Sequence, residues 1–172
     1  MKRLILYRHA KSDWGDASLT DKQRPLNERG KSAAPVMAQH LADRNLFPDL
    51  ILCSSSQRTR ETLIPFIGQL TRETEIHLLD QVYRDGDGDY LNLIRQHGGT
   101  ADTLMVIGHN PATEMSASGL VEKGSGPEWD DMRFKYPSGA IAVIEFNIAN
   151  WDLLQLKSGN FISFTKPRDL MD

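Results

Sequence analysis

Near its start the chain reads Leu4-Ile5-Leu6-Tyr7-Arg8-His9-Ala10-Lys11-Ser12, an apolar run that becomes polar within one residue. Apolar, β-favouring residues bounded by polar ones are typical of a buried strand, so Arg8 and His9 are expected at its carboxyl end. In open α/β sheets that edge is where ligands bind. A guanidinium beside an imidazole at this edge indicates an anion site with a nucleophile in it, and the predicted anion is a phosphoryl group.

Apolar runs and helical patterns alternate along the rest of the chain. Further buried strands are predicted at residues 49–53, 75–79 and 103–107, and helices at 28–44, 57–70, 90–97 and 112–121. This alternation predicts the α/β class, as a three-layer α/β/α sandwich with a mostly parallel central sheet. Residues 10–26 are expected to be a loop lining the site, and residues 122–138 a second loop. A hairpin around Ala149-Asn150 is predicted to join strands 140–146 and 151–156, and the tail from Phe161 is left unassigned.

Composition sets limits on the function. The 172 residues, 40% hydrophobic and 25% charged, fit one domain spanning 1–172. A net charge of −3 argues against a general nucleic-acid binder. The single cysteine, Cys53, excludes an internal disulfide and suits a reducing compartment. No apolar run approaches the length of a membrane span or a signal-peptide core, so the expected location is the cytoplasm, with no membrane partner.

Three buried strands end in chemically active residues. They are followed by Arg8-His9, by Ser54 to Arg58, and by Gly108-His109-Asn110. Because the carboxyl ends of parallel strands meet at one edge, these residues are expected to share a pocket that has no obvious carboxylate partner. Two of the three ends also open helices, whose free N–H groups attract anions.

The residue types suggest roles. A guanidinium fork binds two phosphate oxygens at once, so Arg8 and Arg58 are the predicted clamps. Either histidine could accept the phosphoryl group covalently and lose it to water. His9 is preferred because Arg8 is its neighbour, and His109 would then stabilise the phosphoryl oxygens from the opposite side. No metal and no cofactor are needed.

Together these motifs resemble the signature of the histidine phosphatase superfamily, also called phosphoglycerate mutase-like. The extended motif at residues 8–12, the segment 24–30 and the short chain are similar to its SixA-type phosphohistidine phosphatase branch. The resemblance covers roughly residues 3–156. It implies a phosphoglycerate mutase-like fold, a phosphorylated-histidine intermediate at His9, a pocket of Arg8, Arg58 and His109, and no metal.

One departure from the family pattern concerns the general acid. Many members use a glutamate in the segment corresponding to about 80–90, where this chain has only aspartates, among them Asp85. Sugar or glycerate alkoxides need a proton to leave, whereas the imidazole of phosphohistidine leaves more readily. The missing glutamate therefore favours a phosphohistidine-bearing protein, for example a phosphotransfer domain, although Asp85 could serve a small phosphorylated substrate.

Several alternatives stay open at this point. A small-molecule phosphomonoesterase or mutase of the same fold, and a phospho-ligand binding module without activity, would both use the same pocket. Ser54 and Asn110 are candidate phosphate ligands, although Ser54 could simply cap its helix, and Lys11 and Ser12 are candidates for the rim. Cys53 precedes Arg58 by one residue too few for a cysteine-phosphatase loop. The Asp85–Asp89 segment begins like a calcium loop, but Tyr90 stands where that loop needs glycine and Gln96 where it needs glutamate.

Overall fold

Strand β1 (Lys2–Arg8) lies in the middle of a seven-stranded sheet in the computed structural model, which describes residues 1–171. The strand order is β3-β2-β4-β1-β6-β7-β5. The other strands are β2 (Leu50–Ser54), β3 (Glu75–Leu79), β4 (Thr103–Gly108), β5 (Val121–Lys123), β6 (Ile141–Phe146) and β7 (Gly159–Thr165). Strands β1, β2, β3 and β4 pair in parallel, whereas β6 is antiparallel to both β1 and β7.

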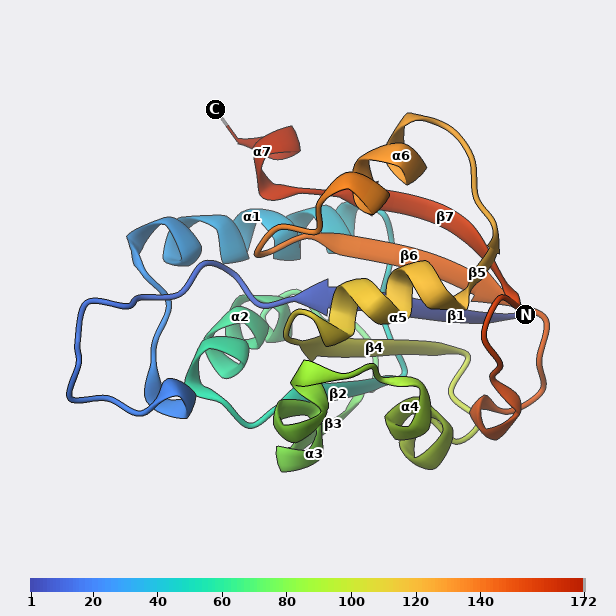
Figure 1. Ribbon diagram of the computed structural model, residues 1–172, viewed down its shortest axis with the longest axis horizontal. Coiled ribbons are helices and arrows are strands. Elements are labelled where there is room, and N and C mark those ends of the chain that lie inside the picture. The colour runs from blue at the N-terminus through green and yellow to red at the C-terminus, as the bar shows by residue number, and fades with distance from the viewer. Residues whose placement is uncertain (172) are drawn as a thin grey trace.

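Helices cover both faces of this sheet, as Figure 1 shows. One face carries α1 (Glu28–Asp43) and α2 (Gln57–Ile67). The other carries α3 (Asp80–Arg84), α4 (Leu91–His97), α5 (Ala112–Leu120) and α6 (Pro127–Phe134), and the short α7 (Pro167–Leu170) follows β7. The predicted three-layer α/β/α sandwich is therefore confirmed. None of the helices within residues 1–171 is both long and apolar enough to cross a bilayer.

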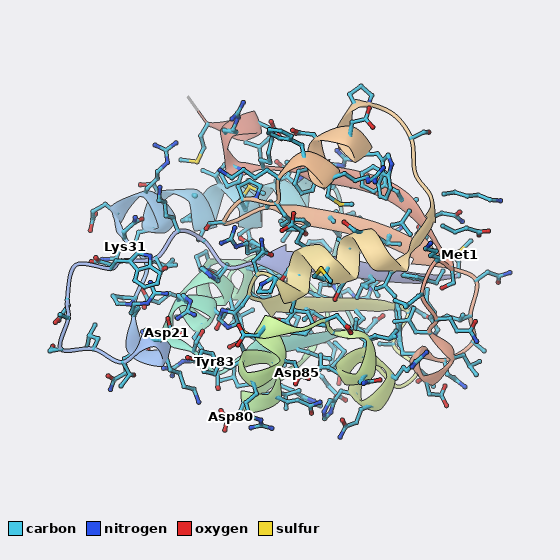
Figure 2. The ribbon with its side chains drawn as sticks, in the orientation of Figure 1. Met1, Asp21, Lys31, Asp80, Tyr83 and Asp85 are labelled. Atoms are coloured by element: carbon cyan, nitrogen blue, oxygen red, sulfur yellow. The ribbon has the colours of Figure 1, made fainter. Side chains whose placement is uncertain are left out.

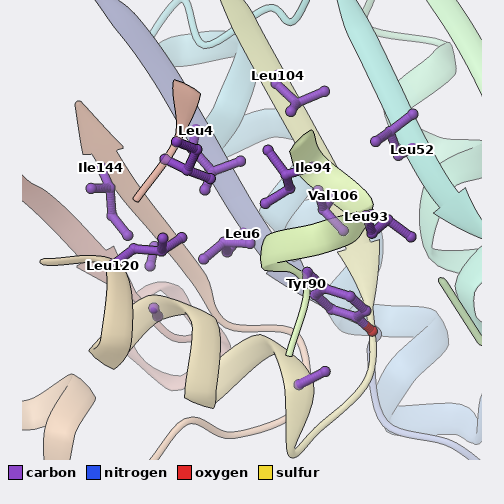
Figure 3. Close-up of a cluster of buried hydrophobic side chains, with 14 of the residues drawn as sticks. Leu4, Leu6, Leu52, Tyr90, Leu93, Ile94, Leu104, Val106, Leu120 and Ile144 are labelled. Carbon is purple, nitrogen blue, oxygen red and sulfur yellow. The ribbon is translucent and has the colours of Figure 1, made fainter. Parts of the chain in front are cut away.

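The alternation of β1 explains why both faces are covered. Leu4 and Leu6 point into the core beneath α4 and α5, which Figure 3 shows in close-up. Ile5 and Tyr7 point into the opposite core with α1 and α2. All four side chains are fully buried, and a strand that is apolar on both faces belongs in the interior of such a sheet.

The first helix is fixed against the residues that follow His9. Asn27 caps α1 by accepting a hydrogen bond from the Gly30 N–H at 2.8 Å. The Asn27 N–H in turn donates to the Lys11 carbonyl at 3.0 Å. A Cβ atom on Gly30 would lie 2.1 Å from that carbonyl oxygen, so the contact requires glycine.

We therefore expect Gly30→Ala to lower the free energy of unfolding by about 2 kcal/mol, which is typical of overpacking. The clash should exceed the gain of about 1 kcal/mol that alanine brings to a helix. Urea unfolding measures the change. Gly68→Ala is the matched control, because the added Cβ would lie at an ordinary 3.5 Å from its nearest neighbour, the Pro65 carbonyl. Equal stability of the two variants would contradict the close packing at Gly30.

Two sequence predictions fail in the second half of the chain, the strand at residues 151–156 and the loop at residues 122–138. The predicted strand 151–156 is wrong: residues 151–153 form a short 3₁₀ helix, and the strand that pairs with β6 is β7. Leu153 and Leu156 are exposed, whereas Trp151 is buried and donates from Nε1 to the Ala101 carbonyl at 2.7 Å. A bulge in the β6–β7 pairing skips Ile162 and breaks the period-two pattern that would have identified β7.

Residues 122–138 are not only a loop. They contain the end of β5 and the whole of α6, which Pro127 opens at its first turn. The segment after β3 also holds α3, which the sequence analysis missed, and α2 ends at Ile67 rather than near residue 70. Helix α3 matters for the site because it carries Tyr83.

Candidate active site

Strands β1 and β4 end on the same side of the sheet in Figure 1. A cavity of about 550 Å³ opens at these two strand ends. The long loop between β1 and α1 forms one of its walls. The lining residues are Arg8, His9, Lys11, Ser12, Trp14, Asp21, Arg24, Arg58, Tyr83, Arg84, Gly86, Asp87, His109, Asn110 and Ser138. The structure thus brings together Arg8, His9, Arg58 and His109, from three segments up to about a hundred positions apart.

His9 presents one free ring nitrogen to this cavity. Its Nδ1 lies 2.6 Å from the Ala10 carbonyl oxygen. A carbonyl only accepts, so Nδ1 carries the proton and Nε2 carries the lone pair. Within residues 1–171 Nε2 has no hydrogen-bond partner. The atom is not fully buried, so it is open to the cavity. The Ala10 N–H is itself held by Thr62 Oγ1 at 3.0 Å, which fixes this turn.

His109 differs because both its ring nitrogens are engaged. Its Nδ1 lies 3.3 Å from an Arg58 amino group and its Nε2 lies 2.8 Å from Ser54 Oγ. A guanidinium only donates, so Nδ1 accepts and Nε2 donates to the serine. Its backbone N–H donates to the Tyr90 hydroxyl at 2.9 Å, a contact that the absence of a side chain on Gly108 permits. The geometry therefore favours His9 over His109 as the nucleophile.

Both histidines are held neutral. Burial lowers the pKa of His9 well below its usual value. The hydrogen bond to the Ala10 carbonyl raises this pKa by less, and the nearby His109 and arginine side chains lower it further. Burial and the charge of Arg58 lower the pKa of His109 to about 3. At neutral pH His9 therefore keeps its lone pair, which a nucleophile requires.

Arg8 and Arg58, the two predicted phosphate-binding arginines, keep hydrogen-bond donors that no residue within 1–171 uses. Arg8 donates from one amino group to the Tyr136 carbonyl at 2.8 Å. Arg58 donates to the Asp21 carbonyl oxygen at 2.7 Å and to its carboxylate at 3.1 Å. The Nε atoms of both arginines are buried without a partner among residues 1–171. These Nε atoms have no accessible surface, so a ligand would bind the amino groups instead; Arg8 Nη2 makes no hydrogen bond within residues 1–171 and is not fully buried, so it is free to bind an anion.

The expectation of a pocket without a carboxylate partner is wrong, because Asp21 pairs with Arg58. Its carboxylate also accepts from Arg24 at 3.0 Å and from the Tyr83 hydroxyl at 2.7 Å. Partial burial raises the pKa of Asp21, but the Tyr83 hydrogen bond and the charge of Arg58 outweigh this and bring it to about 2. Figure 2 shows Asp21 and Tyr83 on neighbouring segments. Asp21 is therefore ionised and compensates part of the positive charge.

These extra site residues escaped the sequence analysis for identifiable reasons. Asp21 follows β1 by more than ten residues in an irregular loop, and Tyr83 lies on the short helix that the periodicity did not show. Arg24 bonds Ser12 Oγ at 2.9 Å and its guanidinium lies 3.5 Å from the centre of the exposed Trp14 ring. The only available signal was the unusual length of the loop.

The remaining candidates divide between the cavity and its surroundings. Lys11, Ser12 and Asn110 line the cavity, as expected for rim or phosphate-binding residues. Ser54 does not: it is fully buried behind His109, where its hydroxyl accepts from His109 and from the Ser56 N–H at 3.2 Å. Asp85 also lies outside the lining, and its carboxylate accepts from Gln81 at 3.3 Å.

Cys53 offers no competing nucleophile. Its thiol is buried in the core beneath α1 and α2, and burial raises its pKa to about 12. A neutral buried thiol neither attacks phosphorus nor faces the cavity. Cys53 belongs to β2 and Arg58 to the first turn of α2, so the two residues do not belong to one phosphate-binding loop.

The neutral state of His109 predicts a pH dependence of stability. Its folded pKa of about 3 lies below the unfolded value of 6.5, so the unfolded state binds more protons between these limits. Stability should therefore fall as pH drops from 7 to 5, by about 2 kcal/mol from this group. Urea unfolding at both pH values measures it, with His109→Gln as comparison. An equal loss in the variant would contradict the assignment.

Comparisons with known proteins agree with this geometry. Residues 4–82 match the sequence profile of the histidine phosphatase superfamily (branch 1). An uncharacterized chloroplast protein of Arabidopsis thaliana is 40% identical over 128 residues. That match covers 69% of this chain and 59% of the relative, so this chain spans less than two thirds of the relative's length.

Solved structures share the whole fold. A protein of Agrobacterium tumefaciens assigned as the phosphohistidine phosphatase SixA has a TM-score of 0.78 and 28% identity, covering 96% of this chain and 97% of that one. A second protein with this assignment, from Nakamurella multipartitia, has a TM-score of 0.80 and 26% identity over 96% of each chain. Residues 4–82 are thus similar to the histidine phosphatase superfamily (branch 1), and the whole fold is similar to two proteins assigned as SixA.

Proposed function

We propose that the protein hydrolyses phosphohistidine on a partner protein through a covalent phosphohistidine at His9. The observation that carries the proposal is the open Nε2 of a neutral His9 in a cavity that Arg8 and Arg58 also line. An in-line phosphoryl group could receive hydrogen bonds from Arg8 and Arg58 while Nε2 faces phosphorus.

The reaction would then proceed in two displacements. In the first, the lone pair of His9 Nε2 forms a bond to phosphorus as the bond to the substrate imidazole breaks, and the imidazole leaves with a proton from solvent. The Ala10 carbonyl stabilises the charge that the His9 ring gains, through the proton on Nδ1. In the second, water attacks phosphorus, the Nε2–P bond breaks, and inorganic phosphate is released. The arginines stabilise the equatorial oxygens in both steps.

The carboxylates of the cavity support phosphohistidine over phosphomonoesters. Asp21 has a pKa of about 2, so at neutral pH it has no proton to give to an alkoxide. Asp85 lies outside the lining, and Asp87 is the other carboxylate that lines the cavity. A general acid contributes roughly 10²- to 10⁴-fold to such reactions. An ester substrate would have only Asp87 to supply this proton, whereas an imidazole leaving group does not need such a residue.

The test is phosphate release from a histidine-phosphorylated phosphotransfer domain, in parallel with phosphoserine and sugar phosphates. We expect kcat/KM for phosphohistidine to be higher by about 100-fold or more, because the ester lacks its acid. Asp87→Asn should leave phosphohistidine turnover within about twofold. Robust ester turnover that this variant abolishes would instead favour a phosphomonoesterase. Tight phosphate binding without turnover of any substrate would favour a binding module.

A further inference from the structure

A second cavity, of about 370 Å³, adjoins the candidate active site. We call it the basic cleft, and it is lined by Arg8, Lys11, Arg29, Ala33, Lys135, Pro137, Ser138, Lys166, Pro167 and Arg168. Arg8, Lys11 and Ser138 line both cavities, so the two are adjacent at Arg8, one of the predicted phosphate-binding arginines. A group bound in the basic cleft would therefore lie directly beside a phosphoryl group on its way to His9.

The basic cleft is positively charged although the chain carries a net charge of −3. Six of its ten lining residues are arginine or lysine, and none is acidic. Lys166 is already neutralised, because its ammonium lies 2.5 Å from the Asp131 carboxylate. Four others are not: within residues 1–171 no carboxylate comes within 4.0 Å of Lys11, Arg29, Lys135 or Arg168. We call these four the cleft cations.

The four cleft cations do not stabilise the fold. Arg29 lies in the first turn of α1, where the helix dipole disfavours a cation. Lys135 directly follows α6, Arg168 lies on α7 and Lys11 follows β1, so four separate segments bring like charges to one opening. Like charges without counter-charges destabilise the compact state. A ligand with negative charge accounts for the arrangement.

Building on the phosphohistidine substrate proposed above, we infer that the basic cleft binds acidic side chains that flank the phosphohistidine of the substrate protein. All four cleft cations are exposed and come from different segments. Such a spread suits several carboxylates on a protein surface, whereas a single small phosphate calls for donors that converge on one point. Attraction of this kind strengthens encounter and specificity and is screened by salt.

Two synthetic phosphohistidine peptides test the inference. They are identical except that three residues on each side of the phosphohistidine are glutamate in one and glutamine in the other. At low salt we expect kcat/KM to be about tenfold higher for the glutamate peptide, equivalent to about 1.4 kcal/mol. Because the contacts are exposed, 0.5 M NaCl should remove most of the preference. Equal kcat/KM for both peptides at low salt would overturn the inference.

Two charge-reversed variants locate the effect. Lys135→Glu/Arg168→Glu should abolish the preference for the glutamate peptide and keep kcat/KM for the glutamine peptide within about twofold. The matched control is Arg44→Glu/Lys123→Glu, which makes the same change in net charge at residues that line neither cavity. A preference that survives the cleft variant, or that the control removes equally, would overturn the inference.

The same assay separates this inference from the proposed function. If the wild type hydrolyses both peptides equally well, the phosphohistidine activity stands and the cleft assignment falls. If the wild type hydrolyses neither, the proposed function falls and takes the cleft assignment with it. Should the cleft variant lose turnover of small bisphosphorylated compounds while its peptide turnover is unchanged, the basic cleft serves a small-molecule substrate instead.

Discussion

His9→Ala is expected to lower kcat for phosphohistidine hydrolysis by about 10⁴-fold or more, as removal of a covalent nucleophile does. The methyl group has no lone pair, so the first displacement has no acceptor and only direct attack by water remains. Arg8 and Arg58 would still bind the phosphoryl group, so the variant should keep affinity for inorganic phosphate; His109, predicted to help, has both ring nitrogens engaged within the protein. Steady-state phosphate release gives kcat, and acid quenching with labelled substrate shows whether a phosphoenzyme forms.

The matched control is His77→Ala, because His77 is an exposed histidine on β3 whose one ion pair is with Glu75 at 3.3 Å. It should keep wild-type turnover and the labelled intermediate. The decisive comparison is with His109→Ala. If His9→Ala retains turnover within tenfold of the wild type while His109→Ala abolishes it, the nucleophile has been assigned to the wrong ring.

Much of this site follows from the sequence because strand ends obey simple geometry. Arg8, Arg58 and His109 lie at or just beyond the carboxyl ends of parallel strands, and such ends share one edge of a sheet. Buried strands are the clearest signal in a sequence, so a residue fixed by one of them can be placed without coordinates. The choice between the two histidines needed the structure, because it depends on which ring nitrogen is already hydrogen-bonded.

What the sequence did not reveal depends on long-range packing. Asp21 reaches Arg58 only because the loop after β1 folds back over the sheet edge, and irregular loops have no periodic signature. Strand β7 was misplaced because pairing with β6, rather than local pattern, defines it. Ser54 was a candidate for either phosphate binding or helix capping, and the sequence cannot show that its hydroxyl bonds the ring of His109 instead of lining the cavity. The basic cleft likewise gathers residues from four segments.

Arg58→Ala is expected to lower kcat/KM by about 10³-fold, the upper end for loss of one preorganised donor to a transition-state charge. Two effects add. The cavity loses a buried clamp, and the Asp21 carboxylate loses the partner that lies 3.1 Å away. That carboxylate then faces the incoming phosphoryl group and repels it. Arg60→Ala is the control, since Arg60 is exposed two positions further along α2, bonds Gln57 and should change kcat/KM by less than twofold.

A double variant separates the two effects. Asp21→Asn removes the negative charge, so Arg58→Ala/Asp21→Asn should recover about tenfold of the loss, consistent with the coupling energy of close charge pairs. Asp21→Asn alone should weaken catalysis only modestly, because Arg58 keeps its bond to the Asp21 backbone carbonyl at 2.7 Å. Steady-state kinetics on all four proteins gives the coupling. If Arg58→Ala stays within tenfold of the wild type, or if the double variant is no better than Arg58→Ala, then Arg58 does not act as a clamp and Asp21 does not oppose the substrate.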